Sequence, residues 1–523
     1  MKKCLALLLA AMMLLLACPV LAEGTSFPLT EEPKTLTVFA RLYATYDDYA
    51  NVKIMKKYEE MTNVHIEWTN VPTASWDSSL AAMMSGGDLP DIIFKAKLSS
   101  ANMTEWGEEG FLVDLAPYLE EYAPNFYKLM QENDDVRISV TSPNGAIYGL
   151  PQILLADELR FPYKLWLNAK VMKALDLKQP TNTDELYEVL KALYNYDGNG
   201  DGQPDQLTMC SSKGGLQQFF YGIFGLMNRG ILQTYVDMDE TTQTPRIFAT
   251  TEGYRKQLEY LRKLYAEGLI DNEIYTEGNR QTVLSAQDQL AGMLYTSTAS
   301  IPSEKADDFE ALTYQITGPD GYAMSGARPH IHSIGNFAIT SACEDVGLAL
   351  RWVDYFYSQE GSEFYHCGVP EEDWTRDENG NIVQTEACLA TKTADMTDDA
   401  WRSQFALWPY GANPSVMGPG FPGGEYAEKP GAAARGLVAY QPAKIWPAFN
   451  FTEEENEVIS SAGSDINSYI SNFAAQVIAG EVELNDESWN TFVTTIENMG
   501  AADVIAVYEN ALTRNYGEDR SAW

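Results

Sequence analysis

Short apolar runs and segments of helical spacing alternate along the first part of the chain. Residues 35–40, 64–68 and 91–94 form short runs in which apolar residues alternate with polar ones or follow one another, as in strands. Between them, residues 52–62 and 76–84 carry apolar side chains at intervals of three and four, which predicts helices with one buried face. This order favours an α/β fold in which a largely parallel sheet is covered by helices on both faces.

The later part of the chain is predicted to be mainly helical. The same helical spacing recurs in residues 181–194, 254–267, 348–357, 466–478, 488–499 and 502–514. Residues 411–436 are rich in Gly, Pro and Ala, and this predicts a surface loop near a ligand or at a crossing between domains. A chain of 523 residues is long enough for two domains.

The N-terminus has the pattern of a signal peptide, residues 1–22. Two lysines precede an apolar run, residues 5–17, that is too short to span a membrane as a mature helix. Two cleavage patterns compete: a lipobox that ends at Cys18, whose thiol would be lipidated, and a small-residue site that ends at Ala22. Both place the mature chain outside the cytoplasmic membrane, attached to the cell surface in the first case and secreted in the second.

The formal net charge of the chain is −38. Such a charge argues against nucleic acid or an anionic membrane surface as a partner. Contact with a membrane is therefore expected only through a lipid anchor on Cys18, and we expect a monomer.

The cysteines beyond the signal region do not have the spacing of a metal site. They are Cys210, Cys343, Cys367 and Cys388, and they define no disulfide framework. One bridge, between Cys367 and Cys388 across the intervening loop, remains an alternative.

The segment with the most specific chemistry reads D-G-N-G-D-G-Q-P-D, residues 197–205. Oxygen-bearing side chains stand at every second position: Asp197, Asn199, Asp201, Gln203 and Asp205. Calcium takes six to eight oxygen ligands, and glycine at the sixth position, here Gly202, allows the sharp turn of a calcium loop. The twelfth position is Thr208 in place of the bidentate Glu of an EF-hand, so a further ligand would come from elsewhere. The segment predicts a structural Ca²⁺ site, with a metal-free polar turn as the alternative.

Several motifs, in order, resemble those of a known protein family. They are V-H-I-E-W at residues 64–68, S-G-G-D-L-P-D-I-I at 85–93, I-Y-G-L-P at 147–151 and the closing helices at 489–514. Together these segments resemble bacterial extracellular solute-binding proteins of the family 1 type, in particular the long, oligosaccharide-oriented Gram-positive branch.

The resemblance implies an α/β fold of the two-lobe, periplasmic-binding-protein-like type II class, with a hinge and a central cleft. The N-lobe would consist of residues 34–162 and about 330–395, and the C-lobe of residues 163–329 and about 396–523. The implied function is an extracytoplasmic receptor that delivers a solute, expected to be an oligosaccharide, to the permease subunits of an ABC importer.

In such a fold the ligand-facing loops follow the carboxyl ends of the strands. Sugars pack their C–H faces on aromatic rings and need hydrogen-bonding partners for their hydroxyls. On this basis the candidate ligand-binding residues are Tyr43, Trp76, Lys95, Trp166, Tyr295, His332 and Trp408. Each aromatic residue has core packing as its alternative role. Lys95 and Arg160 are also candidates for binding the carboxylate of an acidic sugar, with a salt bridge inside the protein as the alternative.

Two other classes of function remain open from the sequence. A secreted carbohydrate-active enzyme would need a pair of carboxylates around the scissile bond, and no such pair is marked by a motif. The nucleophile-elbow, zinc-protease and phosphate-loop motifs are absent from the sequence, so we expect no enzyme. A receptor for a peptide or another non-sugar solute is the other alternative.

Overall fold

The computed structural model describes residues 26–197, 200, 202, 208–231, 234–275, 292–297, 301, 303–378, 380–407, 412–422 and 426–518. The predicted signal peptide with Cys18, the predicted ligand Trp408 and four of the five predicted calcium ligands lie outside these residues. Within the described part, no helix combines the length and the apolar character that crossing a membrane requires.

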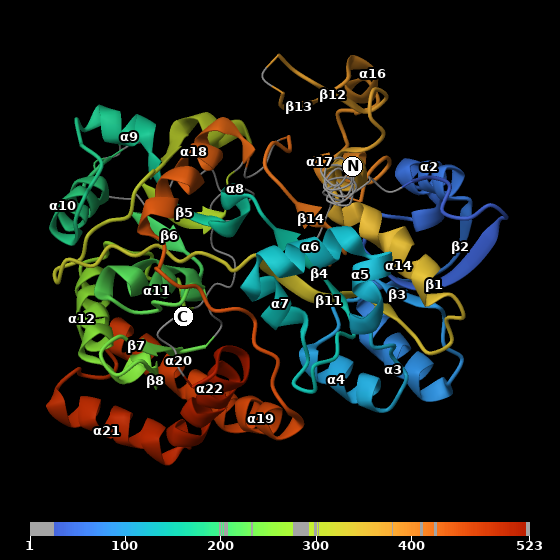
Figure 1. Ribbon diagram of the computed structural model, residues 1–523. Helices are drawn as coiled ribbons and strands as arrows, with labels where there is room; N and C mark the ends of the chain where they lie inside the picture. Colours follow the sequence, from blue (N-terminus) through green and yellow to red (C-terminus); the bar gives the residue numbers. More distant parts are fainter. Residues whose placement is uncertain are drawn as a thin grey trace, which may run out of the picture.

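The described chain forms two α/β lobes that lie side by side (Figure 1). The first lobe is built on a six-stranded sheet of order β14-β4-β11-β3-β1-β2. Its strands are β1 (Lys34–Leu42), β2 (Val64–Pro72), β3 (Ile92–Phe94), β4 (Leu150–Leu154), β11 (Ile331–Ile339) and β14 (Val416–Met417). The helices of this lobe are α2 (Lys53–Thr62), α3 (Trp76–Gly86), α4 (Ser100–Glu108), α5 (Leu119–Tyr122), α6 (Pro124–Glu132), α7 (Asp134–Val140), α14 (Val346–Asp354), α15 (Gln359–Cys367), α16 (Glu386–Leu389) and α17 (Asp398–Arg402). A small hairpin, β12 (Trp374–Arg376) and β13 (Ile382–Gln384), is attached to it.

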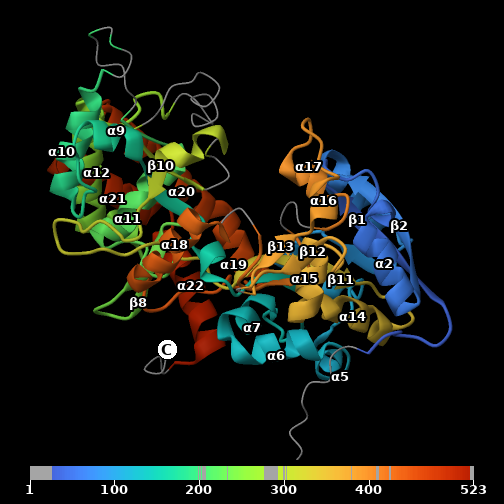
Figure 2. The same ribbon diagram turned by 90° about the horizontal axis from the view of Figure 1, so that it is seen from above.

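The second lobe is built on a four-stranded sheet of order β10-β5-β9-β6. Its strands are β5 (Tyr163–Asn168), β6 (Met209–Ser211), β9 (Met293–Ser297) and β10 (Phe309–Ala311), with a separate hairpin of β7 (Val236–Asp239) and β8 (Thr244–Ile247). The helices are α9 (Ala169–Ala174), α10 (Thr183–Tyr194), α11 (Lys213–Tyr221), α12 (Glu252–Ala266), α18 (Glu428–Leu437), α19 (Glu453–Val458), α20 (Ser464–Ala479), α21 (Asp486–Asn498) and α22 (Ala501–Tyr516). Figure 2 shows α20 and α21 on the side of this lobe away from the blue strands of the first, and α19 and α22 toward the middle of the view.

Each lobe has its own hydrophobic core, and the described chain passes between the lobes at three places. The crossings follow β4 through α8 (Asp157–Arg160), precede β11, and follow β14. The largest buried cluster of the first lobe includes Tyr58, Phe94 and Trp352. The largest cluster of the second includes Phe220, Leu261 and Phe492. Two cores joined by a few strands are the architecture that the resemblance implied.

The predicted helices and strands are largely confirmed, and their ends follow local chemistry. Asn63, with φ of 59°, ends α2 in the left-handed region, and Gly87, with φ of 75°, ends α3. Asn182 begins α10, because its side chain accepts hydrogen bonds from the backbone N–H groups of Asp184 and Glu185.

The prediction of a largely parallel first sheet is confirmed: the pairs β1–β2, β1–β3 and β14–β4 are parallel, and β11 alone, which returns from the second lobe, runs antiparallel to its neighbours β3 and β4. Two other expectations need correction. The chain stays in the first lobe beyond residue 395, since β14 pairs with β4 and Leu407 packs in the first core. The segment predicted as a loop contains α18, in which a run of alanines favours helix and buries Ala433 and Ala434.

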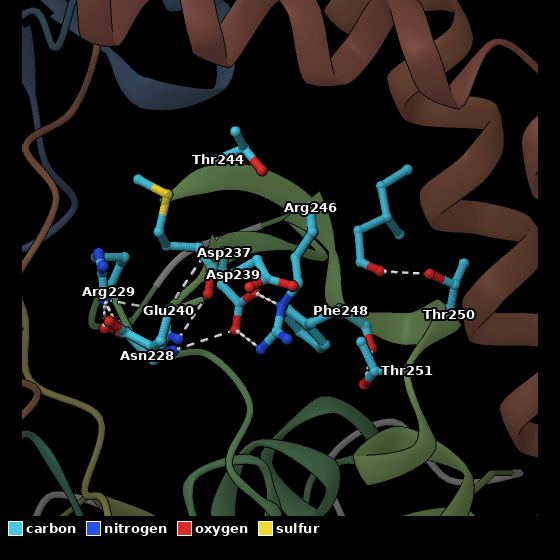
Figure 3. Close-up of polar contacts among 12 residues, drawn as sticks. Asn228, Arg229, Asp237, Asp239, Glu240, Thr244, Arg246, Phe248, Thr250 and Thr251 are labelled. Atoms are coloured by element: carbon cyan, nitrogen blue, oxygen red, sulfur yellow. Dashed lines mark hydrogen bonds and ion pairs between the residues drawn. The ribbon is translucent and has the colours of Figure 1, made fainter. Parts of the chain in front are cut away.

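The hairpin β7–β8 carries a buried polar network (Figure 3). Asp237 is fully buried, and its Oδ1 accepts a hydrogen bond from Nε of Arg246 at 2.8 Å. Arg229, which is 3% exposed, donates to the backbone oxygen of Asn228 at 2.7 Å and to Glu240 at 2.7 Å. The network holds the hairpin to the loop that precedes it.

The four cysteines in the described part are buried and form no disulfide with one another: Cys210, Cys343, Cys367 and Cys388. No bridge joins Cys367 to Cys388 in this structure.

Candidate functional site

One edge of the first sheet gathers the residues that follow three of its strands. In the parallel register of β1 and β3, Ala40 pairs with Phe94, so Arg41 and Lys95 stand next to each other at the carboxyl ends. The start of the antiparallel strand β11 reaches the same edge. The segment after β3 runs beside it, since the N–H groups of Ala96 and Leu98 donate to backbone oxygens of Asn336 and Gly335.

Tyr43 lies at this edge between two cations. Its ring centroid is 5.6 Å from Cζ of Arg41 and 5.4 Å from Nζ of Lys95. The ring is half-buried, and burial raises the pKa of the phenol although Arg41 opposes this shift. Tyr43 therefore offers a neutral, partly exposed ring to a ligand.

Lys95, a predicted ligand residue, is fully buried beneath this edge. Its Nζ donates a hydrogen bond to Oδ1 of Asn413, and the same oxygen accepts a bond from the hydroxyl of Tyr365 at 3.1 Å. The ammonium also lies 6.0 Å from the centroid of the Tyr365 ring. Burial lowers the pKa of Lys95 to about 7. The amine does not reach solvent in this structure.

His332 is exposed at the start of β11, as a ligand contact requires. Its Nδ1 lies 3.4 Å from Nη1 of Arg328. The protein that surrounds the ring, together with the charges of Arg328 and Lys97, lowers the pKa of His332 to about 4. The ring is therefore neutral at physiological pH and lies in a positive electrostatic potential.

A second group of aromatic residues lies at the edge of the other sheet that adjoins the first crossing. Tyr163, the first residue of β5, is half-buried and stacks on Tyr295 with ring centroids 5.9 Å apart. Tyr295 is 9% exposed and rests in turn on Phe219, at 5.0 Å. Tyr295 thus supports the more exposed ring of Tyr163.

The two described tryptophans among the predicted ligand residues are core residues in this structure. Trp76 is 1% exposed and packs on Phe39 with ring centroids 5.3 Å apart. Trp166 is 3% exposed, and its Nε1 donates to the backbone oxygen of Thr296 at 3.1 Å. Both side chains therefore pack against other residues of the protein and do not form part of an exposed surface.

Of the predicted calcium loop, the structure describes Asp197 and two glycines. The carboxylate of Asp197 accepts hydrogen bonds from the backbone N–H groups of Gly200 at 2.6 Å and Gly202 at 2.7 Å. Gly200 and Gly202 have φ values of 80° and 81°, which favour glycine. No group of three or more His, Cys, Asp or Glu able to hold a metal is found among the described residues; Asn199, Asp201, Gln203 and Asp205 are not among them.

A polar groove of ≈ 460 Å³ lies where the crossing segments meet. The residues that line it include Asp135, Arg160 and His330. The backbone N–H of His330 donates to Asp135 at 2.8 Å, and its ring nitrogen lies 3.0 Å from the same carboxylate. Burial alone would raise the pKa of Asp135, but the bonds from His330 and the charge of Arg160 outweigh it and lower that pKa. Arg160, predicted as a carboxylate clamp, thus has a carboxylate of the protein beside it.

Sequence reasoning did not single out Lys97 and Arg328 as site residues. Lys97 is exposed just after β3, and Arg328 lies in the crossing before β11. The position of Lys97 after a short, fully apolar strand was the available signal. Arg328 had none, because only the return of β11 brings it to this edge.

Comparison with known proteins gives the same picture. Residues 43–363 match the family described as bacterial extracellular solute-binding protein. The fructooligosaccharide ABC transporter substrate-binding protein FusA of Streptococcus pneumoniae serotype 4 is 24% identical over 508 residues, which cover 93% of this chain and 91% of FusA.

Two solved structures share the fold. A structure of an EF-hand mutant of S. pneumoniae FusA in complex with fructo-nystose is 21% identical, with a TM-score of 0.68 over 91% of this chain and 98% of that chain. The crystal structure of an extracellular solute-binding protein from Bifidobacterium longum subsp. infantis is 18% identical, with a TM-score of 0.77 over 92% of this chain and 98% of that chain. The predicted resemblance and the two-lobe α/β fold are therefore confirmed, and this chain belongs to the family of bacterial extracellular solute-binding proteins.

Proposed function

We propose that this protein is the extracytoplasmic receptor of an ABC importer and that it binds an oligosaccharide between its two lobes. The observation that carries the proposal is that each sheet presents a half-buried tyrosine at an edge close to the crossing segments, Tyr43 on one lobe and Tyr163 on the other. Aromatic rings offer the apolar faces on which sugar rings pack. The relative FusA is described as a fructooligosaccharide substrate-binding protein, which supports this class of cargo.

The proposed binding residues are Tyr43, Tyr163 and His332, with Tyr295 as the support of Tyr163. Hinge closure of the two lobes around the sugar is the expected motion. The protein would release the sugar unchanged to the permease, and so act as a receptor and not as an enzyme. It would act outside the cytoplasmic membrane, attached to the cell surface if Cys18 is lipidated and secreted if cleavage follows Ala22.

Binding of an oligosaccharide should raise the melting temperature of the protein and leave the sugar intact. At a free ligand concentration of about 100 times Kd, the stabilisation is about 2.7 kcal/mol, which corresponds to a shift of several degrees. A thermal-shift screen with a panel of oligosaccharides measures this, and chromatography of the recovered sugar shows whether a bond was cleaved.

Tyr163→Ala should weaken the binding of an oligosaccharide about tenfold, because a stacking surface is lost. Tyr118→Ala is the matched control, since Tyr118 is 37% exposed and lies on η3 (Ala116–Tyr118). The segment just before η3 lies at the end of the first sheet opposite to Tyr43, because the backbone N–H of Val113 donates to the backbone oxygen of Ile339, the last residue of β11. Equal affinities of the two variants, or cleavage of the sugar, would contradict the proposal.

We also propose a structural calcium ion in the loop of residues 197–205, held by Asp197, Asn199, Asp201, Gln203 and Asp205. The carboxylate of Asp197 already orders the turn through two backbone N–H groups. The solved structure of an EF-hand mutant of the relative FusA supports a calcium loop of this kind.

A calcium chelator should lower the melting temperature by several degrees, and added Ca²⁺ should restore it, because the ion binds only the folded loop. Asp197→Ala should lower the melting temperature and abolish its response to chelator, without loss of sugar affinity. Asp239→Ala is the matched control, since Asp239 accepts bonds from two backbone N–H groups in the β7–β8 turn, at 2.8 and 3.1 Å. A wild-type protein indifferent to chelator would rule out the ion.

A further inference from the structure

Positive side chains without carboxylate partners gather at the ligand-facing edge of the first lobe. Arg41 forms no ion pair with another described residue, and its Nε is buried without a hydrogen-bond partner there. Lys97 is exposed and likewise has no ion pair or hydrogen bond within the described part of the chain. Arg41 is the penultimate residue of β1, and Lys97 lies shortly after the end of the neighbouring strand β3.

This arrangement is unusual for the chain, because acidic residues outnumber basic ones. The sequence has 74 Asp and Glu against 36 Lys and Arg, so a carboxylate is the commoner neighbour of any cation. Elsewhere arginines contact carboxylates closely: Arg246 contacts Asp237 at 2.8 Å, Arg514 contacts Glu455 at 2.8 Å, and Arg376 contacts Glu363 at 2.7 Å. Cations left without such a partner in an acidic protein point to a negative charge that comes from outside.

The surroundings of these cations suit a sugar that carries a carboxylate. Arg41 lies against two aromatic rings, 5.6 Å from the centroid of Tyr43 and 6.0 Å from that of Trp76. A guanidinium held in this way can present its planar N–H groups to a planar carboxylate. Desolvation of the His332 ring by the surrounding protein lowers its pKa to about 4, and the nearby positive charges of Arg328 and Lys97 lower it further.

Resting on the proposed receptor function, we propose that the cargo is an acidic oligosaccharide of uronic acid type. Arg41 and Lys97 bind its carboxylate, while Tyr43 packs against the sugar ring that bears it. The negative charge of the ligand then takes the place of the missing protein carboxylate. The net negative charge of the protein repels an anionic ligand at long range. A positive edge at the binding site counteracts this repulsion, which explains why a strongly acidic protein keeps one.

The test compares trigalacturonate with its fully methyl-esterified form, which has the same length and no charge. Titration calorimetry on the full-length protein should give an affinity at least about tenfold higher for the acid, the gain typical of one charge-assisted hydrogen bond. The difference should shrink at high salt, because exposed charges are screened. Lys97→Gln should remove most of the difference in affinity between the acid and the ester, and a folded Arg41→Gln variant should do the same.

Lys170→Gln is the matched control. It removes one positive charge from α9, which begins after the last residue of β5, whereas Tyr163 is the first residue of that strand. This variant should leave the preference for the acid unchanged. An independent readout is the imidazole of His332, whose pKa should rise in the complex with trigalacturonate and not with the ester.

The outcomes separate this inference from the receptor function on which it rests. Neutral oligosaccharides that bind as tightly as trigalacturonate would overturn the inference and leave the receptor function standing. A sulfated oligosaccharide that binds while trigalacturonate does not would overturn the assignment of a carboxylate. Failure of every sugar, neutral or charged, to bind would overturn both.

Discussion

Lys95→Met should stabilise the folded protein by about 3–5 kcal/mol at pH 7. The wild-type amine is fully buried, and burial lowers its pKa from the model-compound value of 10.5 to about 7. Folding must therefore take an ammonium out of water or remove its proton, and both cost free energy. Methionine fills similar space without this cost, and Asn413 keeps its hydrogen bond from Tyr365.

The pH dependence gives the signature of this cost. Between pH 7 and 10.5 the unfolded chain binds a proton at Lys95 that the folded protein does not, so the free energy of unfolding of the wild type rises with pH. The slope is about 1.4 kcal/mol per pH unit, and the advantage of Lys95→Met should fall by about 2–3 kcal/mol between pH 7 and pH 9. Urea denaturation of both proteins at the two pH values measures this. Lys170→Met, at an exposed lysine, should show no such change, and parallel curves for the wild type and Lys95→Met would refute the prediction.

The same variant links stability to function. Lys95 lies 5.4 Å from the ring of Tyr43, beneath the edge to which we assign the carboxylate of the ligand. A nearby negative charge would favour the protonated amine. Lys95→Met should thus be more stable than the wild type and bind trigalacturonate less tightly, a trade-off that is common at binding sites.

Arg246→Met should cost about 3 kcal/mol or more, because it leaves the carboxylate of Asp237 buried without its cation. Asp237 is 0% exposed; within the described residues its remaining hydrogen bond comes from the backbone N–H of Asn228 at 3.4 Å, and the charge of Arg229 acts on it more weakly than that of Arg246. Figure 3 shows the guanidinium of Arg246 beside this carboxylate. Urea denaturation measures the loss, and the additional replacement Asp237→Asn should recover part of it.

The pH dependence of Arg246→Met has the opposite sign to that of Lys95. Burial raises the pKa of Asp237 and Arg246 opposes this shift, so its removal raises the pKa further. Because the folded variant then holds a proton that the unfolded chain has lost, its stability should rise as the pH falls from 7 toward 4. Arg137→Met is the matched control, since Arg137 pairs with Asp134, whose side chain is 77% exposed, and such pairs contribute less than about 1 kcal/mol. A loss for Arg246→Met no larger than that for Arg137→Met would contradict the prediction.

The sequence predicted the helices and strands well where one face is buried or a local cap is present. α2, α3 and α10 begin or end at residues whose side chains or backbone preferences are visible in the sequence, such as Asn63, Gly87 and Asn182. The prediction from the sequence failed where pairing with a distant segment determines the local structure. Two residues of β14 carry no recognisable strand pattern, and they form a strand because β4 offers them an edge.

The candidate site divides in the same way. The residue types that bind sugars, and their places after strands, could be read from the sequence for Tyr43, Tyr295 and His332. The burial of Trp76, Lys95 and Trp166 could not be predicted, because neighbours far along the chain decide whether a side chain in or after a strand points to solvent or to the core. For Lys95 these neighbours are Tyr365 and Asn413.

The sequence by itself therefore determined the family, the two α/β lobes and most of their helices and strands, since periodicity and caps act over a few residues. Only the tertiary structure decided that Arg41, Lys97, Arg328 and His332 share one edge and that Lys95 lies beneath it. The physical reason is that electrostatics and burial act through space. They depend on how β1, β3 and the returning β11 pair, and the pairing of distant strands leaves no local pattern in the sequence.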